Sequence, residues 1–168
     1  VTAGALADQG CSPPGEGPSP PVDLWGISGH GIGMPPERLI LFYDGVCPFC
    51  IGWVRFLLDR DGYDRLRFAA LQSDWTRRFF QERGLPHPGT GSIRVWDGEH
   101  LYDRSEAAGM IARSLPGIWK LAAGLQRLPK SWRDGLYDWI AGRRYQWFGR
   151  RDQCWVPGPE VWEKFLDL

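Results

Sequence analysis

The chain has 168 residues, 43% of them hydrophobic, which is enough for one folded domain with a buried core and excludes a fully disordered protein. Its 20 basic and 20 acidic residues cancel, so the net charge gives no indication of a nucleic-acid partner. Four unevenly spaced cysteines exclude a disulfide framework, and the sequence has no apolar run long enough for a membrane-spanning helix. No basic segment followed by an apolar stretch marks a secretory signal, so we expect a cytoplasmic protein.

The first segment, residues 1–37, contains eight Gly and seven Pro and almost no periodic apolar residues. Such a segment buries too little surface to offset the entropy of ordering it, so we predict a disordered leader. We expect a folded core over residues 38–115. A helical extension, packed on the same domain, is expected over residues 116–168.

The first predicted element of the core is a strand over residues 39–43, because its continuous apolar run suits a strand covered on both faces. A CxxC motif follows, and Pro48 fits the first turn of a helix, where a missing N–H costs nothing. Apolar residues at helical spacing follow it, so the helix is expected to begin beside Cys47 and to close at residues 61–62.

The next elements complete an α/β pattern. Alternation over residues 66–70 predicts a second strand, and Ser73 is expected to cap a helix that Gly84 stops. Residues 93–102 read as a hairpin, and Ser105 is expected to cap a helix that runs to residue 115. The order β-α-β-α-β-β-α, with a parallel first pair and an antiparallel hairpin, predicts a thioredoxin-like fold with a C-terminal helical extension.

The extension is helical in pattern and rich in tryptophan and arginine. Residues 113–151 hold nine basic residues and two acidic ones, a net charge of +7 that the acidic ends of the chain offset. Such a segment can bind an anionic membrane surface or a nucleic acid. Four large apolar side chains share one helical face, and we favour core packing for them: Trp132, Leu136, Trp139 and Ile140.

The CxxC motif carries the predicted chemistry. At a helix N-terminus, Cys47 would lie beside unpaired backbone N–H groups and the positive end of the helix dipole, which favour its thiolate. Cys50 lies one turn later and is able to close a disulfide with Cys47. We therefore predict a thiol–disulfide oxidoreductase in which Cys47 is the nucleophile and Cys50 the resolving thiol.

Two further residues, Asp44 and Cys154, each have two alternative interpretations. Asp44, three residues before Cys47, is placed to exchange a proton with Cys50, and it is equally an ordinary turn residue that bonds loop amides. Cys154 is either a third thiol that exchanges with the pair or a small buried hydrophobe. Cys11, in the leader, is assigned no role.

The rival to redox chemistry is a non-enzymatic zinc-binding or interaction module that uses Cys47, Cys50 and Cys154. A structural zinc site needs four ligands, usually from two knuckles, and no second knuckle is visible. The histidines have no partner at ligand spacing and are assigned nothing: His30, His87 and His100. We expect no cofactor and no bound metal.

Several motifs together give a resemblance to a known family. The run from Leu41 to Cys50 resembles the DxxCxxC signature of the DCC family of thiol–disulfide oxidoreductases. The similarity continues through several further segments, over roughly residues 39–158. These segments are residues 67–73, Ser105 with residues 107–108, Pro129 with residues 133–134, Tyr137, residues 144–149, residues 152–154 and Pro157.

The resemblance implies a thioredoxin-like fold and disulfide oxidoreductase activity, and it makes Cys154 part of the family pattern. The implied partners are a protein or small-molecule disulfide and a thiol reductant, with no nucleic acid and at most a weak membrane-surface contact. Thioredoxin-like proteins place a cis proline before the third strand to present backbone to a substrate. Here Ser92 precedes Ile93 instead, so we expect either a different substrate groove or no binding of extended peptides.

Overall fold

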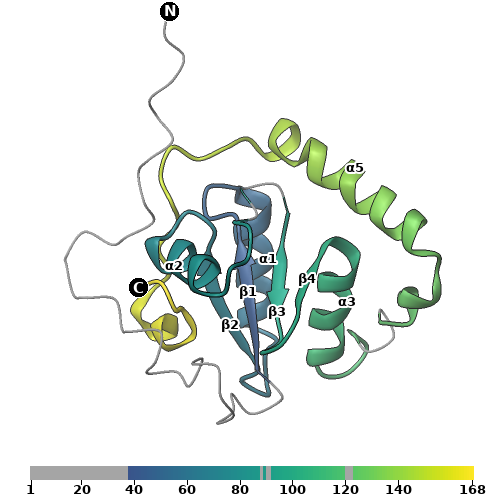
Figure 1. Ribbon diagram of the computed structural model, residues 1–168, viewed down its shortest axis with the longest axis horizontal. Coiled ribbons are helices and arrows are strands. Elements are labelled where there is room, and N and C mark those ends of the chain that lie inside the picture. The colour runs from purple at the N-terminus through teal and green to yellow at the C-terminus, as the bar shows by residue number, and fades with distance from the viewer. Residues whose placement is uncertain (1–37, 88, 90–91, 120–122) are drawn as a thin grey trace, which may run out of the picture.

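The computed structural model describes residues 38–87, 89, 92–119 and 123–168 (Figure 1). The predicted leader of residues 1–37, with Cys11 and His30, lies outside the described residues. Within the described ranges, no helix is both long and apolar enough to cross a membrane.

A four-stranded mixed sheet forms the centre of the fold, with strand order β2-β1-β3-β4. The strands are β1 (Leu39–Tyr43), β2 (Leu66–Ala70), β3 (Arg94–Trp96) and β4 (Leu101–Asp103). β1 pairs parallel with β2 and antiparallel with β3, and β3 pairs antiparallel with β4. The predicted α/β class and thioredoxin-like arrangement are confirmed.

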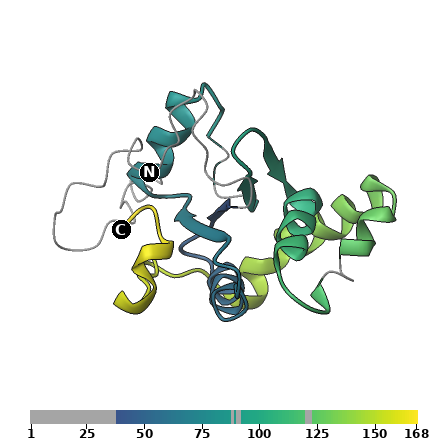
Figure 2. The ribbon, with the colours of Figure 1, turned by 90° about the horizontal axis from the view of Figure 1, so that it is seen from below.

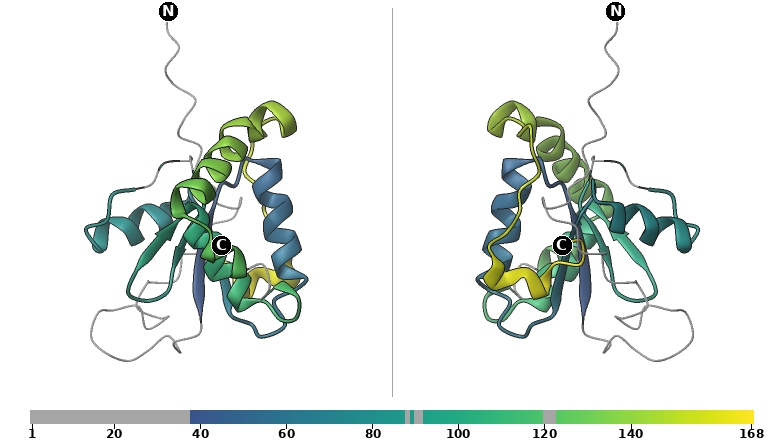
Figure 3. Two further views of the ribbon diagram at one scale, coloured as in Figure 1. Left: turned by 90° about the vertical axis from the view of Figure 1, so that its right-hand side faces the viewer. Right: turned by 90° about the vertical axis from the view of Figure 1, so that its left-hand side faces the viewer.

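Helices cover both faces of this sheet. Figures 2 and 3 show α1 (Pro48–Leu58) on one side of the sheet and α2 (Asp74–Glu82) on the other. Leu39, Leu41 and Tyr43 share a core cluster with residues of α1 and of α3 (Arg104–Ser114). Ile40 and Phe42 share a second cluster with the aromatic side chains of α2. This two-sided burial explains why the sequence of β1 is apolar throughout.

Two helix starts test the capping predictions. The Ser73 hydroxyl accepts a hydrogen bond from the Thr76 N–H at 3.2 Å and caps α2 as predicted. The prediction that Ser105 caps α3 is wrong, because the helix begins at Arg104 with Asp103 at the cap position. The Ser105 hydroxyl instead bonds a carboxylate oxygen of Asp134 at 2.5 Å.

The extension contains a short 3-10 helix η2 (Ala123–Arg127), the long helix α5 (Lys130–Phe148) and a second 3-10 helix η3 (Pro159–Lys164). In Figures 1 and 3, α5 runs across one end of the sheet, beyond α1 and α3. Gly149, with a φ of 72°, ends α5.

The predicted core packing of the α5 tryptophans is wrong. Trp132, Leu136 and Trp139 are exposed, and Ile140 is only half-buried. The helix contacts the rest of the fold through its opposite, polar face, which includes Arg133, Tyr137 and Arg144, among the residues that bond to the core domain. The periodicity therefore located an apolar face correctly but assigned it to the wrong side.

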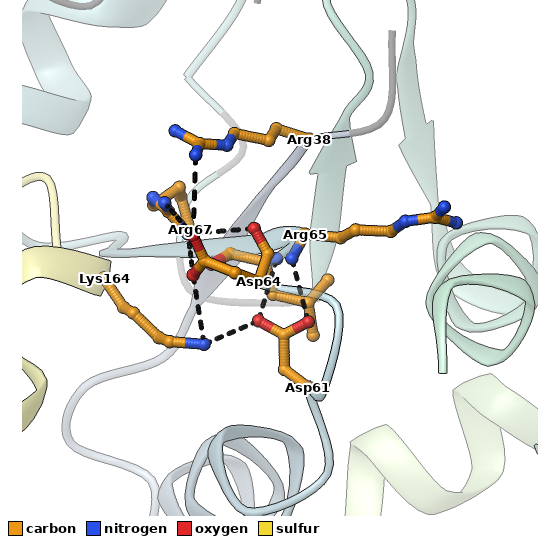
Figure 4. Close-up of polar contacts among 7 residues, drawn as sticks. Arg38, Asp61, Asp64, Arg65, Arg67 and Lys164 are labelled. Atoms are coloured by element: carbon orange, nitrogen blue, oxygen red, sulfur yellow. Dashed lines mark hydrogen bonds and ion pairs between the residues drawn. The ribbon is translucent and has the colours of Figure 1, made fainter. Parts of the chain in front are cut away.

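The C-terminal segment is anchored to the loop before β2 by Lys164, which pairs with Asp61 and Asp64 (Figure 4). Asp61 is buried, and its carboxylate accepts the N–H groups of Arg65 at 2.9 Å and Leu66 at 3.1 Å. Lys164 of η3 pairs with the same carboxylate at 2.8 Å. Asp64, next to this pair, binds Arg67 with both oxygens at 2.9 Å.

The buried contacts of Asp61 lead to a prediction about the stability of the fold. Replacing Asp61 by Ala removes the acceptor of a buried N–H group and leaves Lys164 without this partner, so we expect a loss of about 3 kcal/mol in the free energy of unfolding. Asp74→Ala is the matched control, because its pair with Arg77 is exposed and should be worth less than about 1 kcal/mol. Urea denaturation of the two variants measures both values, and equal losses would contradict the prediction.

Candidate functional site

The CxxC motif lies at the junction between the end of β1 and the start of α1. After β1, the loop of residues 44–46 turns the chain, and the Cys47 N–H bonds the Asp44 carbonyl at 3.2 Å. Cys47 occupies the N-cap position of α1, and Pro48 stands in its first turn. The Cys47 carbonyl accepts the Ile51 N–H at 3.0 Å. The strand, turn and helix start all fall where the sequence predicted them.

The two sulfurs differ in accessibility. Both are free thiols, but Cys47 is 0% exposed, whereas Cys50 is half-buried. The sequence predicted only that Cys47 lies at the helix start, and it did not predict that this residue is buried. The polar face of α5 packs against the loop that carries Cys47, where Arg144 and Tyr145 bond Asp44. The surroundings of the sulfur are nevertheless charged rather than apolar.

The pKa values of the two thiols move in opposite directions. Hydrogen bonding from the Cys50 thiol is the largest cause that lowers the pKa of Cys47 to about 6, and burial opposes it. The Cys50 N–H and the charge of Arg144 lower it further, whereas Asp44 raises it. The same hydrogen bond, together with burial, raises the pKa of Cys50 well above its ordinary value. At neutral pH, Cys47 is therefore mainly a thiolate and Cys50 a thiol that donates to it.

The sequence predicted the thiolate at Cys47 but not its principal cause. Helix amides were expected to dominate, and the Cys50 backbone N–H does contribute in that sense. The larger contribution comes from the neighbouring side-chain thiol. Because this thiol is one turn along α1, the position of Cys50 stabilises the anion as well as allowing disulfide closure.

Asp44 is buried beside the pair, and both of its oxygens accept hydrogen bonds. Gln72 Nε2 donates to Oδ1 at 2.7 Å, and the Val46 N–H donates to the same oxygen at 3.2 Å. Arg144 Nη2 pairs with Oδ2 at 3.3 Å, and the Tyr145 hydroxyl donates to that oxygen too. Asp44 therefore bonds a loop amide, as an ordinary turn residue does, and also ties α5 to the loop that carries Cys47.

Arg144 is a residue of the candidate site that the sequence did not single out. It is buried, although it lies within a helix whose other arginines are exposed or half-buried. Its positive charge lowers the pKa of both Cys47 and Cys50, so it acts on the two sulfurs as well as on Asp44. The available signal was its place on the polar face of α5, opposite the tryptophans. No local pattern marks what that face packs against.

Tyr137, also on α5, bonds the backbone just before the start of β3. Its hydroxyl accepts the Ile93 N–H at 3.0 Å and lies 3.3 Å from the Ser92 hydroxyl. Ile93 immediately precedes β3, whose start lies beside the end of β1 in the antiparallel register. All described peptide bonds here are trans. The backbone group that could pair with an extended peptide is thus already bonded to α5.

Cys154 lies near the same loop without a demonstrated role. It is half-buried and packs against the core cluster that contains Tyr43 and Val54. The chain around it runs along the loop before Cys47, since the Trp155 N–H bonds the Gly45 carbonyl at 3.0 Å. Its sulfur is disulfide-bonded in this structure, and its action as a third exchanging thiol stays a prediction.

The described part of the chain contains no set of ligands for the alternative zinc site. Among those residues, no group of three or more His, Cys, Asp or Glu side chains is arranged to hold a metal ion. His87 bonds the Leu71 carbonyl through Nε2 at 3.1 Å, and His100 packs beside Tyr102.

Comparisons with known proteins point to one family. The sequence model described as DCC1-like thiol-disulfide oxidoreductase matches residues 41–150. The chain is 37% identical over 131 residues to the uncharacterized protein YuxK of Bacillus subtilis, covering 78% of this chain and 95% of that protein. It is also 37% identical over 120 residues to the DCC family protein At1g52590, chloroplastic, of Arabidopsis thaliana, covering 70% of this chain and 69% of that protein. No solved structure matches the chain.

Proposed function

The chain belongs to the DCC1-like thiol–disulfide oxidoreductase family, and on this basis we propose that it exchanges disulfides through Cys47 and Cys50. The observation that carries the proposal is the placement of the pair, with Cys47 at the N-cap of α1 and Cys50 one turn along the helix. The opposite directions of the two pKa shifts support the same assignment. A thiolate is the attacking species in disulfide exchange, and a pKa near 6 keeps Cys47 in that form at neutral pH.

The proposed reaction has two exchange steps. The Cys47 thiolate attacks one sulfur of a substrate disulfide, forms a mixed disulfide, and releases the other sulfur as a thiolate that takes up a proton. Cys50 then loses its proton and attacks the Cys47 sulfur, which releases the second substrate thiol and leaves a Cys47–Cys50 disulfide. A thiol reductant restores both cysteines. Since Cys47 is fully buried, the first step needs a local displacement of the residues packed around it.

Asp44 is the proposed acceptor of the Cys50 proton in the second step. Its charge raises the pKa of both thiols, which supports its closeness to them. Asp44→Asn should therefore slow release from the mixed disulfide more than its formation. The substrate is proposed to be a protein or small-molecule disulfide, and a cytoplasmic location stays a prediction.

The deciding experiment traps the mixed disulfide. We expect Cys47→Ser to lose at least about 99% of exchange with a small disulfide, and Cys50→Ser to accumulate a stable Cys47 adduct that mass spectrometry detects. Wild-type Cys47 should react with iodoacetamide with a pH midpoint near 6. An adduct on Cys50 in the Cys47→Ser variant, with activity retained, would reverse the assigned roles. Absence of exchange in the wild type would reject the proposed function.

A further inference from the structure

The outward face of α5 exposes three tryptophans and a leucine in one row that also includes Arg143. Trp132 is 73% exposed and Trp139 is 50% exposed, and Leu136 and Trp147 are exposed in line with them. Residues 132, 136, 139, 143 and 147 follow one another at intervals of three or four, so they share one side of the helix. We call these five residues the α5 stripe. Contiguous exposed apolar surface of this kind marks an interaction site in a folded protein.

The stripe carries positive charge. Residues 139–151 include four arginines and no acidic residue. The Arg143 guanidinium lies 4.6 Å from the centre of the Trp139 ring, and Arg150 and Arg151 are exposed just beyond the end of the helix. Long cationic side chains beside indole rings suit a boundary between apolar and anionic surroundings.

The acidic residues of α5 lie on its other side. Asp134 bonds the Ser105 hydroxyl, and Asp138 pairs with Arg104, so both carboxylates face α3. The helix is thus divided into a polar face that contacts the core and an outer face of tryptophan, leucine and arginine. This division leaves the exposed side with a net positive charge.

A second group of exposed aromatic side chains lies at the end of α5, next to the CxxC motif. Phe148, at the end of α5, stacks on Phe49 with ring centres 5.2 Å apart. The ring centres of Phe49 and Trp53 are 6.3 Å apart. Phe148 and Trp53 are both exposed.

We propose that the α5 stripe docks on an anionic phospholipid surface, with the helix lying in the plane of the interface. The tryptophan and leucine side chains enter the boundary between headgroups and acyl chains, and the arginines contact lipid phosphates. A second copy of this chain fits less well, because a symmetric pairing would place Arg143 and Trp139 of each copy against a surface of the same charge. The proposal does not depend on the exchange chemistry of Cys47 and Cys50.

The test is sedimentation of the full chain with vesicles. We expect binding to vesicles of equal parts phosphatidylglycerol and phosphatidylcholine at low salt, and at least about tenfold weaker binding to phosphatidylcholine alone. The double variants Trp132→Ser/Trp139→Ser and Arg143→Glu/Arg150→Glu should each lower binding to the anionic vesicles by at least about tenfold. Trp162→Ser/Arg78→Glu is the matched control, because both residues are exposed and lie outside the stripe.

Thermal unfolding monitored by circular dichroism shows that each variant is folded before binding is compared. Equal binding to both kinds of vesicle would overturn the proposal, as would stripe variants that bind like the control. Light scattering supplies the remaining outcome: a dimer that the tryptophan variant dissociates, without vesicle binding, would assign the stripe to a second copy and overturn the lipid proposal.

Discussion

Replacing Arg144 by Gln is expected to raise the pKa of Cys47 from about 6 to about 7 or higher. Two effects act in the same direction. The positive charge that stabilises the thiolate is lost, and the negative charge of buried Asp44 is no longer balanced by its ion pair. At pH 6 the thiolate fraction of Cys47 should fall from about one half to about one tenth, with a matching loss in alkylation rate.

The same substitution should destabilise the fold. Asp44 and Arg144 are both buried, and removal of one partner of a buried pair leaves an uncompensated charge, which typically costs about 3 kcal/mol or more. Arg144→Lys keeps the charge and should retain most of the low Cys47 pKa. The two variants therefore separate the electrostatic role of Arg144 from its packing.

The measurement is the rate of iodoacetamide alkylation at Cys47 against pH, together with urea denaturation. Arg143→Gln is the matched control, because Arg143 is the adjacent residue in α5 and is exposed. The control should show the wild-type midpoint. If Arg144→Gln and Arg143→Gln gave the same midpoint, the charge of Arg144 would have no part in stabilising the thiolate.

Asp167→Asn is expected to remove a large pH dependence of stability. Asp167 is buried near the end of β2, where its Oδ2 accepts the Ala70 N–H at 2.7 Å. Burial raises the pKa of Asp167 to about 7, although hydrogen bonds from Ala70, its own N–H and Ser73 oppose the rise. An aspartate in an unfolded chain has a pKa of about 3.9.

The direction of this pH dependence follows from the difference in proton binding between the folded and the unfolded chain. Because the folded chain binds this proton more tightly than the unfolded chain, the stabilisation is fully present below about pH 4. It is lost as the pH rises through about 7, since the buried carboxylate must then be charged. The free energy of unfolding should fall by up to about 4 kcal/mol across this window.

Urea denaturation at pH 5 and pH 8 tests this dependence. Cys47 acts in the opposite sense, since its lowered pKa favours the folded state increasingly above pH 6. The useful quantity is therefore the difference in free energy of unfolding between wild type and Asp167→Asn at each pH. In this difference the contributions of the other titrating groups cancel. Asp152→Asn, an exposed control, should follow the wild type. If the difference in free energy of unfolding between wild type and Asp167→Asn were the same at pH 5 and pH 8, Asp167 would not titrate in this range.

The sequence alone was sufficient for the core elements because their signals are local. The apolar run of residues 39–43, the CxxC motif and Pro48 lie next to one another in the chain, and together they predict a strand followed by a helix that begins at Cys47. The Ser73 cap likewise depends on one hydroxyl and an N–H three residues later. Such patterns are fixed by backbone geometry within a turn or two.

The site required contacts that no local pattern encodes. Arg144 reaches Asp44 across 100 positions, and Asp167 reaches Ala70 across 97. The polar face of α5 was visible as a periodicity, but its contact with the loop that carries Cys47 depends on how the whole extension packs. The same packing decides that the tryptophans of α5 are exposed.

The chain by itself therefore determined the α/β topology, the start of α1 and the identity of the thiol pair. Only the tertiary structure decided which face of α5 meets the core, and hence which charges surround the sulfur of Cys47. The physical reason is that periodicity states how side chains are distributed around a helix, whereas burial depends on what that helix meets. Here the polar face met buried Asp44, and the ion pair with Arg144 holds the apolar face outward.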